Sequence, residues 1–236
     1  MRPFLCWLAV GLAWIPLRGQ SVEFASGPRQ VSLIELFTSE GCSSCPPAEA
    51  WLGDLARHPR LWQDFVPISF HVDYWNRLGW RDVFSSAENT RRQYAYAEVW
   101  KTSSVYTPCF VRDGVEWRRS RDLSPTSSKP GSLTATYQAG RVTAVFAPER
   151  PGDRGEYKVH AAILAGGISS NVTAGENRGE TLRHEFVAVS MASSALGESV
   201  ALVPPSKPMS QRFALAVWIT RAGELMPVQA TGGWLE

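Results

Sequence analysis

The sequence predicts an α/β domain followed by an all-β domain, and three observations indicate this. The first half alternates apolar runs with helix-like segments, the second half holds only short strand-like runs, and a stretch with proline and serine but no apolar periodicity separates them. Alternating strands and helices form mainly parallel sheets, whereas short runs separated by turn residues are typical of β-sandwiches. We therefore expect domains at residues 28–118 and 132–236, joined by a linker at 119–131.

Residues 1–20 have the pattern of a cleavable secretory signal peptide. Arg2 is followed by an apolar stretch from Phe4 to Leu17 and then by the small residue Gly19. This stretch is shorter than the roughly 20 apolar residues that cross a bilayer. We expect export, to a periplasm or to the medium, and no stable membrane anchor after cleavage.

The charge balance excludes one class of partner. Removal of the signal takes away Arg2 and Arg18, so the formal net charge of +2 falls to zero, and no lysine-rich block occurs along the chain. Nucleic acid is therefore not an expected partner. The remaining chain keeps three cysteines, and an odd number in an oxidising compartment leaves one thiol to explain.

Five segments of the first half have recognisable patterns. Val31–Phe37 and Val66–Val72 are apolar strands, Ala48–Leu55 and Ala87–Trp100 are helix-like, and Asp113-Gly114 is a strong hairpin turn. Strand, helix, strand, helix and hairpin is the element order of a thioredoxin fold, which we predict for this half.

The second half contains six strand-like segments separated by turn residues, which predict an all-β, sandwich-like domain. They lie at residues 133–137, 141–147, 157–165, 181–190, 213–220 and 224–230.

The CxxC pair Cys42 and Cys45 lies between the first strand and the first helix. A cysteine at a helix N-terminus has its thiolate stabilised by unpaired N–H groups and by the helix dipole. Cys42 is the predicted nucleophile, and Cys45, one turn later, can resolve a mixed disulfide. Pro46 and Pro47 are tolerated at the helix start and stiffen it. A static disulfide or part of a zinc site are the structural alternatives.

Thr107-Pro108 precedes the predicted hairpin, where thioredoxin-like folds place a cis-proline facing the dithiol. We expect a cis peptide bond there, with Thr107 offering backbone groups to an extended partner peptide. The loop after the second strand leaves the ligand-binding edge of the sheet, so Asp73 and Trp75 are candidate substrate-binding residues. Aromatic residues at this density are also common in cores and interfaces.

Two further groups near the pair have open interpretations. Glu35 interrupts an apolar strand, where a buried carboxylate could accept a proton from Cys45 or could instead be a sheet-edge residue that reaches water. Cys109 is a third redox thiol, a metal ligand with Cys42 and Cys45, or a small buried apolar residue. We interpret His71 as a buried histidine with satisfied hydrogen bonds rather than a ligand.

Four motifs together resemble a family of secreted bacterial proteins of unknown function with a thioredoxin-like N-terminal part, the domain of unknown function 1223. They are ELFTSEGCSSCPPAEA, FHVDYWNRLGWRDVF, VYTP and GENRGETL. The resemblance implies export and thioredoxin-like folding and assigns no activity or substrate. It makes Cys42, Cys45 and Pro108 the positions of interest. The chain departs from the expected pattern at Cys109, where glutamine is expected. From its residues alone, we interpret GENRGETL as a plain turn.

These observations predict an exported thiol-disulfide oxidoreductase that acts on a protein or a small thiol or disulfide. Catalysis would use Cys42, Cys45 and Glu35, and it would need no cofactor beyond the disulfide. The rival is a periplasmic metal-binding protein with Cu(I) on Cys42, Cys45 and Cys109, because thiolates favour that ion. A binding module whose cysteines only clip the chain is the third hypothesis. The oligomeric state is not predicted.

Overall fold

The computed structural model describes residues 21–118, 122–153, 155–204, 210 and 212–235. The predicted signal peptide at 1–20 therefore lies outside the described residues. Within the described ranges there are two α-helices, α1 (Pro46–Asp54) and α2 (Ala87–Trp100), and two short 3-10 helices, η1 (Leu55–Arg57) and η2 (Asn76–Leu78). Neither α-helix combines the length and apolarity needed to cross a bilayer.

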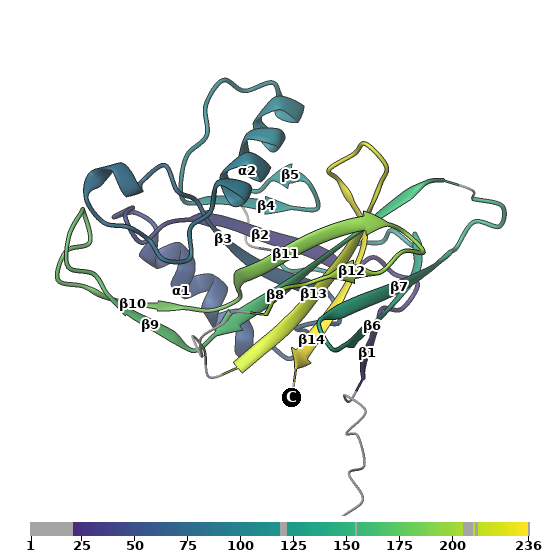
Figure 1. The fold of residues 1–236 in the computed structure, drawn as a ribbon. Helices are drawn as coiled ribbons and strands as arrows, with labels where there is room; N and C mark the ends of the chain where they lie inside the picture. Colours follow the sequence, from purple (N-terminus) through teal and green to yellow (C-terminus); the bar gives the residue numbers. More distant parts are fainter. Residues whose placement is uncertain (1–20, 119–121, 154, 205–209, 211, 236) are drawn as a thin grey trace, which may run out of the picture.

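The rest of the regular structure is β-strand, arranged in an eight-stranded sheet, a four-stranded sheet and a small two-stranded ribbon (Figure 1). The strands are β1 (Val22–Ala25), β2 (Ser32–Thr38), β3 (Phe65–His71), β4 (Cys109–Arg112), β5 (Val115–Glu116), β6 (Gly131–Gln138), β7 (Arg141–Pro148), β8 (Tyr157–Gly166), β9 (Ile168–Asn171), β10 (Thr181–His184), β11 (Val187–Ala195), β12 (Val200–Ala201), β13 (Arg212–Arg221) and β14 (Pro227–Leu235).

The predicted fold class is wrong. The large sheet has the order β14-β13-β8-β11-β3-β2-β4-β5, so strands from both halves of the sequence form one mixed sheet. The first half does not close a thioredoxin-like sheet because the free edge of β3 is taken by β11, which pairs with it in parallel through Val187 and Ser69. The chain is mostly β, and the described part of the predicted linker, 122–130, carries no helix or strand.

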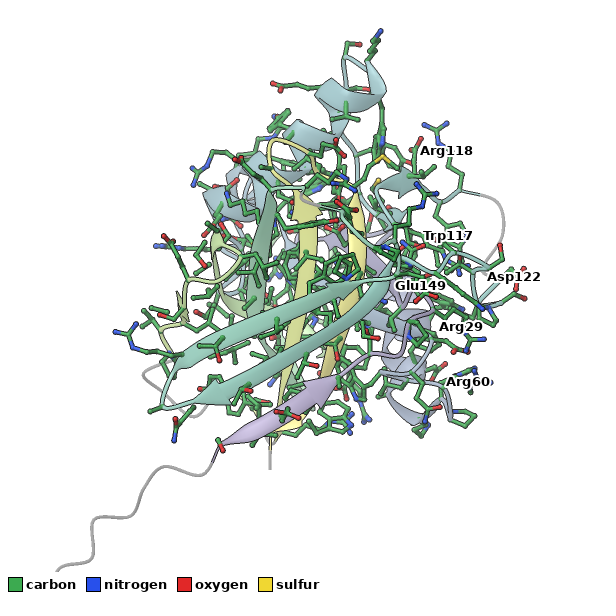
Figure 2. The ribbon with its side chains drawn as sticks, turned by 90° about the vertical axis from the view of Figure 1, so that its right-hand side faces the viewer. Arg29, Arg60, Trp117, Arg118, Asp122 and Glu149 are labelled. Atoms are coloured by element: carbon green, nitrogen blue, oxygen red, sulfur yellow. A yellow bond between two sulfur atoms is a disulfide. The ribbon has the colours of Figure 1, made fainter. Side chains whose placement is uncertain are left out.

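The second half does not form a separate sandwich either. Strands β8, β11, β13 and β14 extend the large sheet. Strands β6 and β7 pair with each other in the four-stranded sheet, where β6 also pairs with β1 from the N-terminal part of the chain and β7 also pairs with β12. Figure 2 shows β6 and β7 crossing in front of β13 and β14, and the buried residues of these two layers form one apolar cluster. The sandwich-like packing therefore joins two sheets that each contain strands from distant parts of the sequence.

Strands β8 and β13 are apolar on both faces because each face packs into a different core. In β13, Leu215 and Val217 pack toward the four-stranded sheet, whereas Ala216 and Trp218 pack into the core that contains β2 and β3. Strand β14 also packs against β2 and β3. Gly232 lets β14 lie close to its neighbour β13, since a Cβ atom there would meet the carbonyl oxygen of Leu215 in β13 at 2.3 Å.

The individual elements of the first half follow their predicted patterns. Strands β2 and β3 are completely buried and parallel, and α2 has its expected bounds. The Ser86 side chain caps α2 by accepting the N–H of Asn89 at 3.1 Å. The hairpin turn uses Asp113 and Gly114, both with positive φ, as an Asp-Gly turn requires.

The two helices lie on opposite faces of β2, which decides where the site residues go. Thr38 bonds Glu49 of α1, whereas Glu35 bonds Arg92 of α2. Because successive strand residues point to opposite faces, Thr38 and Glu35 must separate in this way. The carboxyl end of β2 then leads directly into the cysteine loop at the start of α1.

Candidate functional site

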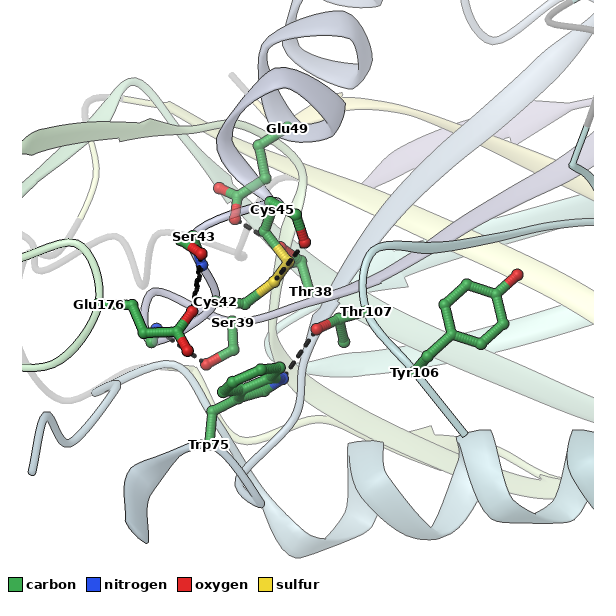
Figure 3. Close-up of a disulfide and its surroundings, with 12 residues drawn as sticks. Thr38, Ser39, Cys42, Ser43, Cys45, Glu49, Trp75, Tyr106, Thr107 and Glu176 are labelled. Carbon is green, nitrogen blue, oxygen red and sulfur yellow. Dashed lines mark hydrogen bonds between the residues drawn. A yellow bond between two sulfur atoms is a disulfide. The ribbon is translucent and has the colours of Figure 1, made fainter. Parts of the chain in front are cut away.

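Cys42 and Cys45 form a disulfide immediately before α1 (Figure 3), with their Cα atoms 5.4 Å apart. Cys45 is the N-cap residue of the helix. The preceding turn is tight, because the N–H of Gly41 donates to Ser39 Oγ at 3.1 Å and a Cβ at Gly41 would lie 3.1 Å from the Cβ of Trp75. Both cysteines are buried, and Cys42 is 1% exposed.

The N–H groups expected to stabilise a thiolate are not free at the first positions of α1. Pro46 and Pro47 have none, and the N–H groups of Ala48 and Glu49 donate to the carbonyl oxygen of Cys45 at 2.9 and 3.1 Å. The polar contact of the Cys42 sulfur is instead the Ser44 hydroxyl at 3.4 Å. In a reduced pair, this hydroxyl and the positive end of the helix dipole are the groups placed to stabilise a Cys42 thiolate.

A loop from the second half of the chain holds the cysteine loop in place. Asn177 Nδ2 donates to the carbonyl oxygens of Glu40 at 2.8 Å and Cys42 at 3.0 Å. Glu176 accepts hydrogen bonds from the Ser43 N–H at 3.0 Å and the Ser43 hydroxyl at 2.8 Å. These residues belong to GENRGETL, so its interpretation as a plain turn missed direct hydrogen bonds to the cysteine loop.

Trp75 and Thr107 lie on another side of the disulfide (Figure 3). The indole Nε1 of Trp75 donates to Thr107 Oγ1 at 2.8 Å. The Thr107–Pro108 peptide bond is cis, which confirms that expectation. The structure therefore brings Trp75 and Thr107 to the cysteine pair, and Pro108 directly follows Thr107.

Asp73 has a different environment from the one expected for a substrate-binding residue. Its carboxylate accepts the Thr90 hydroxyl at 2.6 Å, and its N–H donates to the same hydroxyl oxygen at 3.0 Å. These bonds attach the loop after β3 to α2. The described contacts of Asp73 position the loop that carries Trp75.

Glu35 is completely buried on the face of β2 that α2 covers. Its two carboxylate oxygens accept hydrogen bonds from Arg92 Nε at 2.6 Å and from the Tyr96 hydroxyl at 2.5 Å. Burial and the charge of Arg92 act in opposite directions on Tyr96, and its pKa remains well above the ordinary value. Glu35 thus forms a buried ion pair, and its role as a proton acceptor stays a prediction.

Cys109 is a buried free thiol at the start of β4. Burial, followed by the nearby charge of Glu116, raises the pKa of Cys109 to about 12. A buried thiol with this pKa is an unreactive one at neutral pH. Binding of Cu(I) to Cys42, Cys45 and Cys109 stays a prediction, and the group of potential metal ligands found among the described residues contains no cysteine.

A buried polar cluster lies next to the disulfide on the α1 face of β2 and β3. His184 Nδ1 bonds Glu49 at 2.5 Å and its Nε2 bonds Glu40 at 3.1 Å, while His71 Nδ1 bonds Asp82 at 2.7 Å. Sequence pattern draws attention only to His71 among these five residues, which lie in the loop after β2, in α1, in β3, in the loop before α2 and in β10.

The cluster has strongly coupled charges. Burial lowers the pKa of His184, but its bonds to Glu40 and Glu49 outweigh burial and raise the pKa to about 10. Burial also lowers the pKa of His71, and the charge of Asp82 outweighs it, so this pKa is raised as well. For Asp82, burial raises the pKa, but the charge of His71 dominates and lowers it. The cluster is therefore a network of ion pairs that joins both halves of the chain.

Comparison with known proteins identifies the family. A family model described as Protein of unknown function (DUF1223) matches residues 33–220. The chain belongs to the DUF1223 family. This match confirms the family that the four sequence motifs indicate, and the DUF1223 description assigns no activity.

Two solved structures are similar to this DUF1223 chain. One is the crystal structure of the protein AGR_C_4864 from Agrobacterium tumefaciens, with a TM-score of 0.60 and 24% identity over 86% of this chain and 94% of that chain. The other is HBP35 of Porphyromonas gingivalis, with a TM-score of 0.54 and 12% identity over 88% of this chain and 76% of that chain. At these identities the likeness concerns the fold. No curated protein matches the sequence.

Proposed function

We propose that the protein is an exported thiol-disulfide oxidoreductase whose redox centre is the Cys42–Cys45 pair. The observation that carries this proposal is the disulfide between two cysteines of a CxxC motif at the N-terminus of a helix. A reduced partner would attack Cys42, and Cys45 would leave as a thiolate. A second partner thiol would then release Cys42, so that two electrons and two protons pass from the partner to the pair.

Export is part of this proposal. The predicted signal peptide at residues 1–20 would deliver the chain to an oxidising compartment, where disulfides persist. The partner would be a protein or a small thiol or disulfide.

Reaction at Cys42 requires a local movement, because its side chain is 1% exposed. The neighbouring Ser43 and Ser44 are exposed, and the contacts that hold this turn come from Glu176 and Asn177. Release of those contacts would expose the Cys42 sulfur while α1 stays in place. Trp75 and Thr107 would then form the wall against which an extended partner lies.

The test compares three cysteine variants of the purified mature chain in the reduction of insulin disulfides by dithiothreitol. This assay runs the steps above in reverse, because dithiothreitol reduces the pair and Cys42 then attacks an insulin disulfide. Cys42→Ser is expected to abolish turnover, and Cys45→Ser is expected to accumulate mixed disulfides with the partner. Cys109→Ser is the matched control, since it removes a buried thiol outside the pair and leaves turnover unchanged. Full activity in the folded Cys42 variant would refute the proposal.

A further inference from the structure

Three buried side chains next to the disulfide come together in a way that the redox proposal does not use. They are Glu49 in the first part of α1, His71 at the end of β3 and His184 at the end of β10. One potential ligand atom from each lies within 4.8 Å of the others. His71 is 0% exposed, His184 is 1% exposed and Glu49 is 8% exposed.

His71 carries an unsatisfied ring nitrogen. Its Nδ1 bonds Asp82, whose carboxylate is also held by the N–H groups of Glu40 at 2.9 Å and Phe84 at 2.9 Å. Its Nε2 is buried and has no hydrogen-bond partner among the described residues. A buried nitrogen without a partner is destabilising, and a bound ion would remove that cost. Nε2 is therefore the free ligand atom of His71.

His184 has the complementary arrangement. Its Nε2 bonds Glu40, and Glu40 in turn accepts the indole N–H of Trp80 at 2.7 Å. Its Nδ1 faces the Glu49 carboxylate at 2.5 Å. Each histidine thus has one ring nitrogen bonded to a carboxylate that accepts further hydrogen bonds from the protein. The other ring nitrogen of each histidine can serve as a metal ligand. Metal-binding histidines commonly have this outer carboxylate, which fixes the ring and its tautomer.

The charges of the cluster also suit a cation. Three carboxyl groups, those of Glu40, Glu49 and Asp82, are buried around two imidazoles. Two imidazole nitrogens and one carboxylate oxygen are ligands that Zn²⁺ and similar divalent transition metals accept. A divalent ion would take the place of two protons, the one between His184 and Glu49 and the one on Nε2 of His71 in its ion pair with Asp82. The His184 and Glu49 ligand atoms need to separate by less than about 1 Å to reach tetrahedral ligand spacing.

We propose that Glu49, His71 and His184 form a binding site for a divalent transition-metal ion, for which Zn²⁺ is the probe. Asp82 and Glu40 position the two histidines. The site links α1 and β3 of the first half to β10 of the second half, so the ion stabilises the packing of the GENRGETL hairpin against the cysteine loop. Its occupancy does not depend on the redox state of Cys42 and Cys45.

The test measures Zn²⁺ binding by calorimetry, and Co²⁺ binding by visible absorption, on the full mature chain after treatment with a chelator. We expect one ion per chain. His71→Ala and the nearly isosteric Glu49→Gln are each expected to weaken Zn²⁺ binding at least 100-fold. Asp82→Asn acts through His71 and is expected to weaken it about 10- to 100-fold.

His160→Gln is the matched control, because His160 is half-buried, stacks on Trp218 and lies outside the cluster. It should leave Zn²⁺ binding unchanged. The double variant Cys42→Ser, Cys45→Ser should also bind Zn²⁺ as the unchanged chain does, which separates this site from any thiolate site and from the redox proposal. Circular dichroism verifies folding, and Glu49→Gln decides the outcome if His71→Ala does not fold. Absence of binding, equal affinity in folded Glu49→Gln, or loss of binding in the double cysteine variant overturns the proposal.

Discussion

Replacement of Asn177 by alanine removes the side chain that ties the GENRGETL loop to the cysteine loop. Asn177 is 6% exposed and donates two hydrogen bonds, to the carbonyl oxygens of Glu40 and Cys42. Each bond contributes about 0.5–1.5 kcal/mol net, and buried acceptors left unpaired add to the loss. We therefore expect Asn177→Ala to lower the free energy of local opening by about 2–3 kcal/mol.

The same change should expose the disulfide more often. Because Cys42 is 1% exposed, its reduction by dithiothreitol requires the loop to open first. A loss of about 2–3 kcal/mol in opening free energy corresponds to a reduction rate roughly 30- to 150-fold higher, at 1.4 kcal/mol for each factor of ten. The assay quenches the reaction with an alkylating reagent and follows the two thiols by mass spectrometry.

Asn171→Ala is the matched control for this experiment. Asn171 lies in β9, is exposed, and accepts a hydrogen bond from the Thr181 hydroxyl at 2.9 Å. Its loss should change the reduction rate less than about twofold, as for most surface substitutions. Equal reduction rates in Asn177→Ala and Asn171→Ala would show that this loop does not shelter the disulfide.

Three further predictions concern charges. Glu176→Gln removes a negative charge beside Ser43, so the pKa of Cys42 in the reduced protein should fall. The rate of thiol alkylation as a function of pH measures this pKa, and an unchanged pKa at low salt contradicts the prediction. Glu35→Ala leaves the buried Arg92 without its ion-pair partner, so the free energy of unfolding should fall by about 3–5 kcal/mol. Urea denaturation measures this change, and a loss below about 1 kcal/mol would exclude a buried ion pair. Burial and then the charge of Arg92 lower the pKa of His160 to about 3. Between about pH 6.5 and pH 3 this histidine is therefore protonated in the unfolded state and neutral in the folded state, so the free energy of unfolding decreases as pH falls through that range. His160→Gln should reduce that pH dependence, and equal slopes for the two proteins would argue against it.

The sequence predicted the local elements of the first half because their signals are local. Apolar runs without polar breaks mark β2 and β3, and Asp113-Gly114 marks the hairpin. The fold class was wrong because it depends on one pairing that has no local signal. Strand β11 joins β3 through Val187 and Ser69, which are far apart in the sequence. The residues of β3 read the same whether its edge is free or paired with a distant strand.

The candidate site could be predicted only in part, for the same reason. The CxxC spacing identifies the disulfide, and the element order identifies the cis-proline. Asn177 and His184 contact the site from the second half across 135 residues or more, so spacing gives no guidance. The available signal was a polar, glycine-flanked motif between strand-like runs. The pattern around His71 indicates a buried histidine with satisfied hydrogen bonds, because sequence does not show that only one of its two ring nitrogens has a partner among the described residues.

Measurement of the reduction potential of the Cys42–Cys45 pair tests the central claim most directly. The mature chain is equilibrated in glutathione or dithiothreitol buffers of defined potential, and the fraction of free thiols is determined by alkylation. A redox-active pair should titrate between about −270 and −120 mV, the range of known catalytic dithiols. A potential below about −300 mV would identify a structural disulfide and contradict the account.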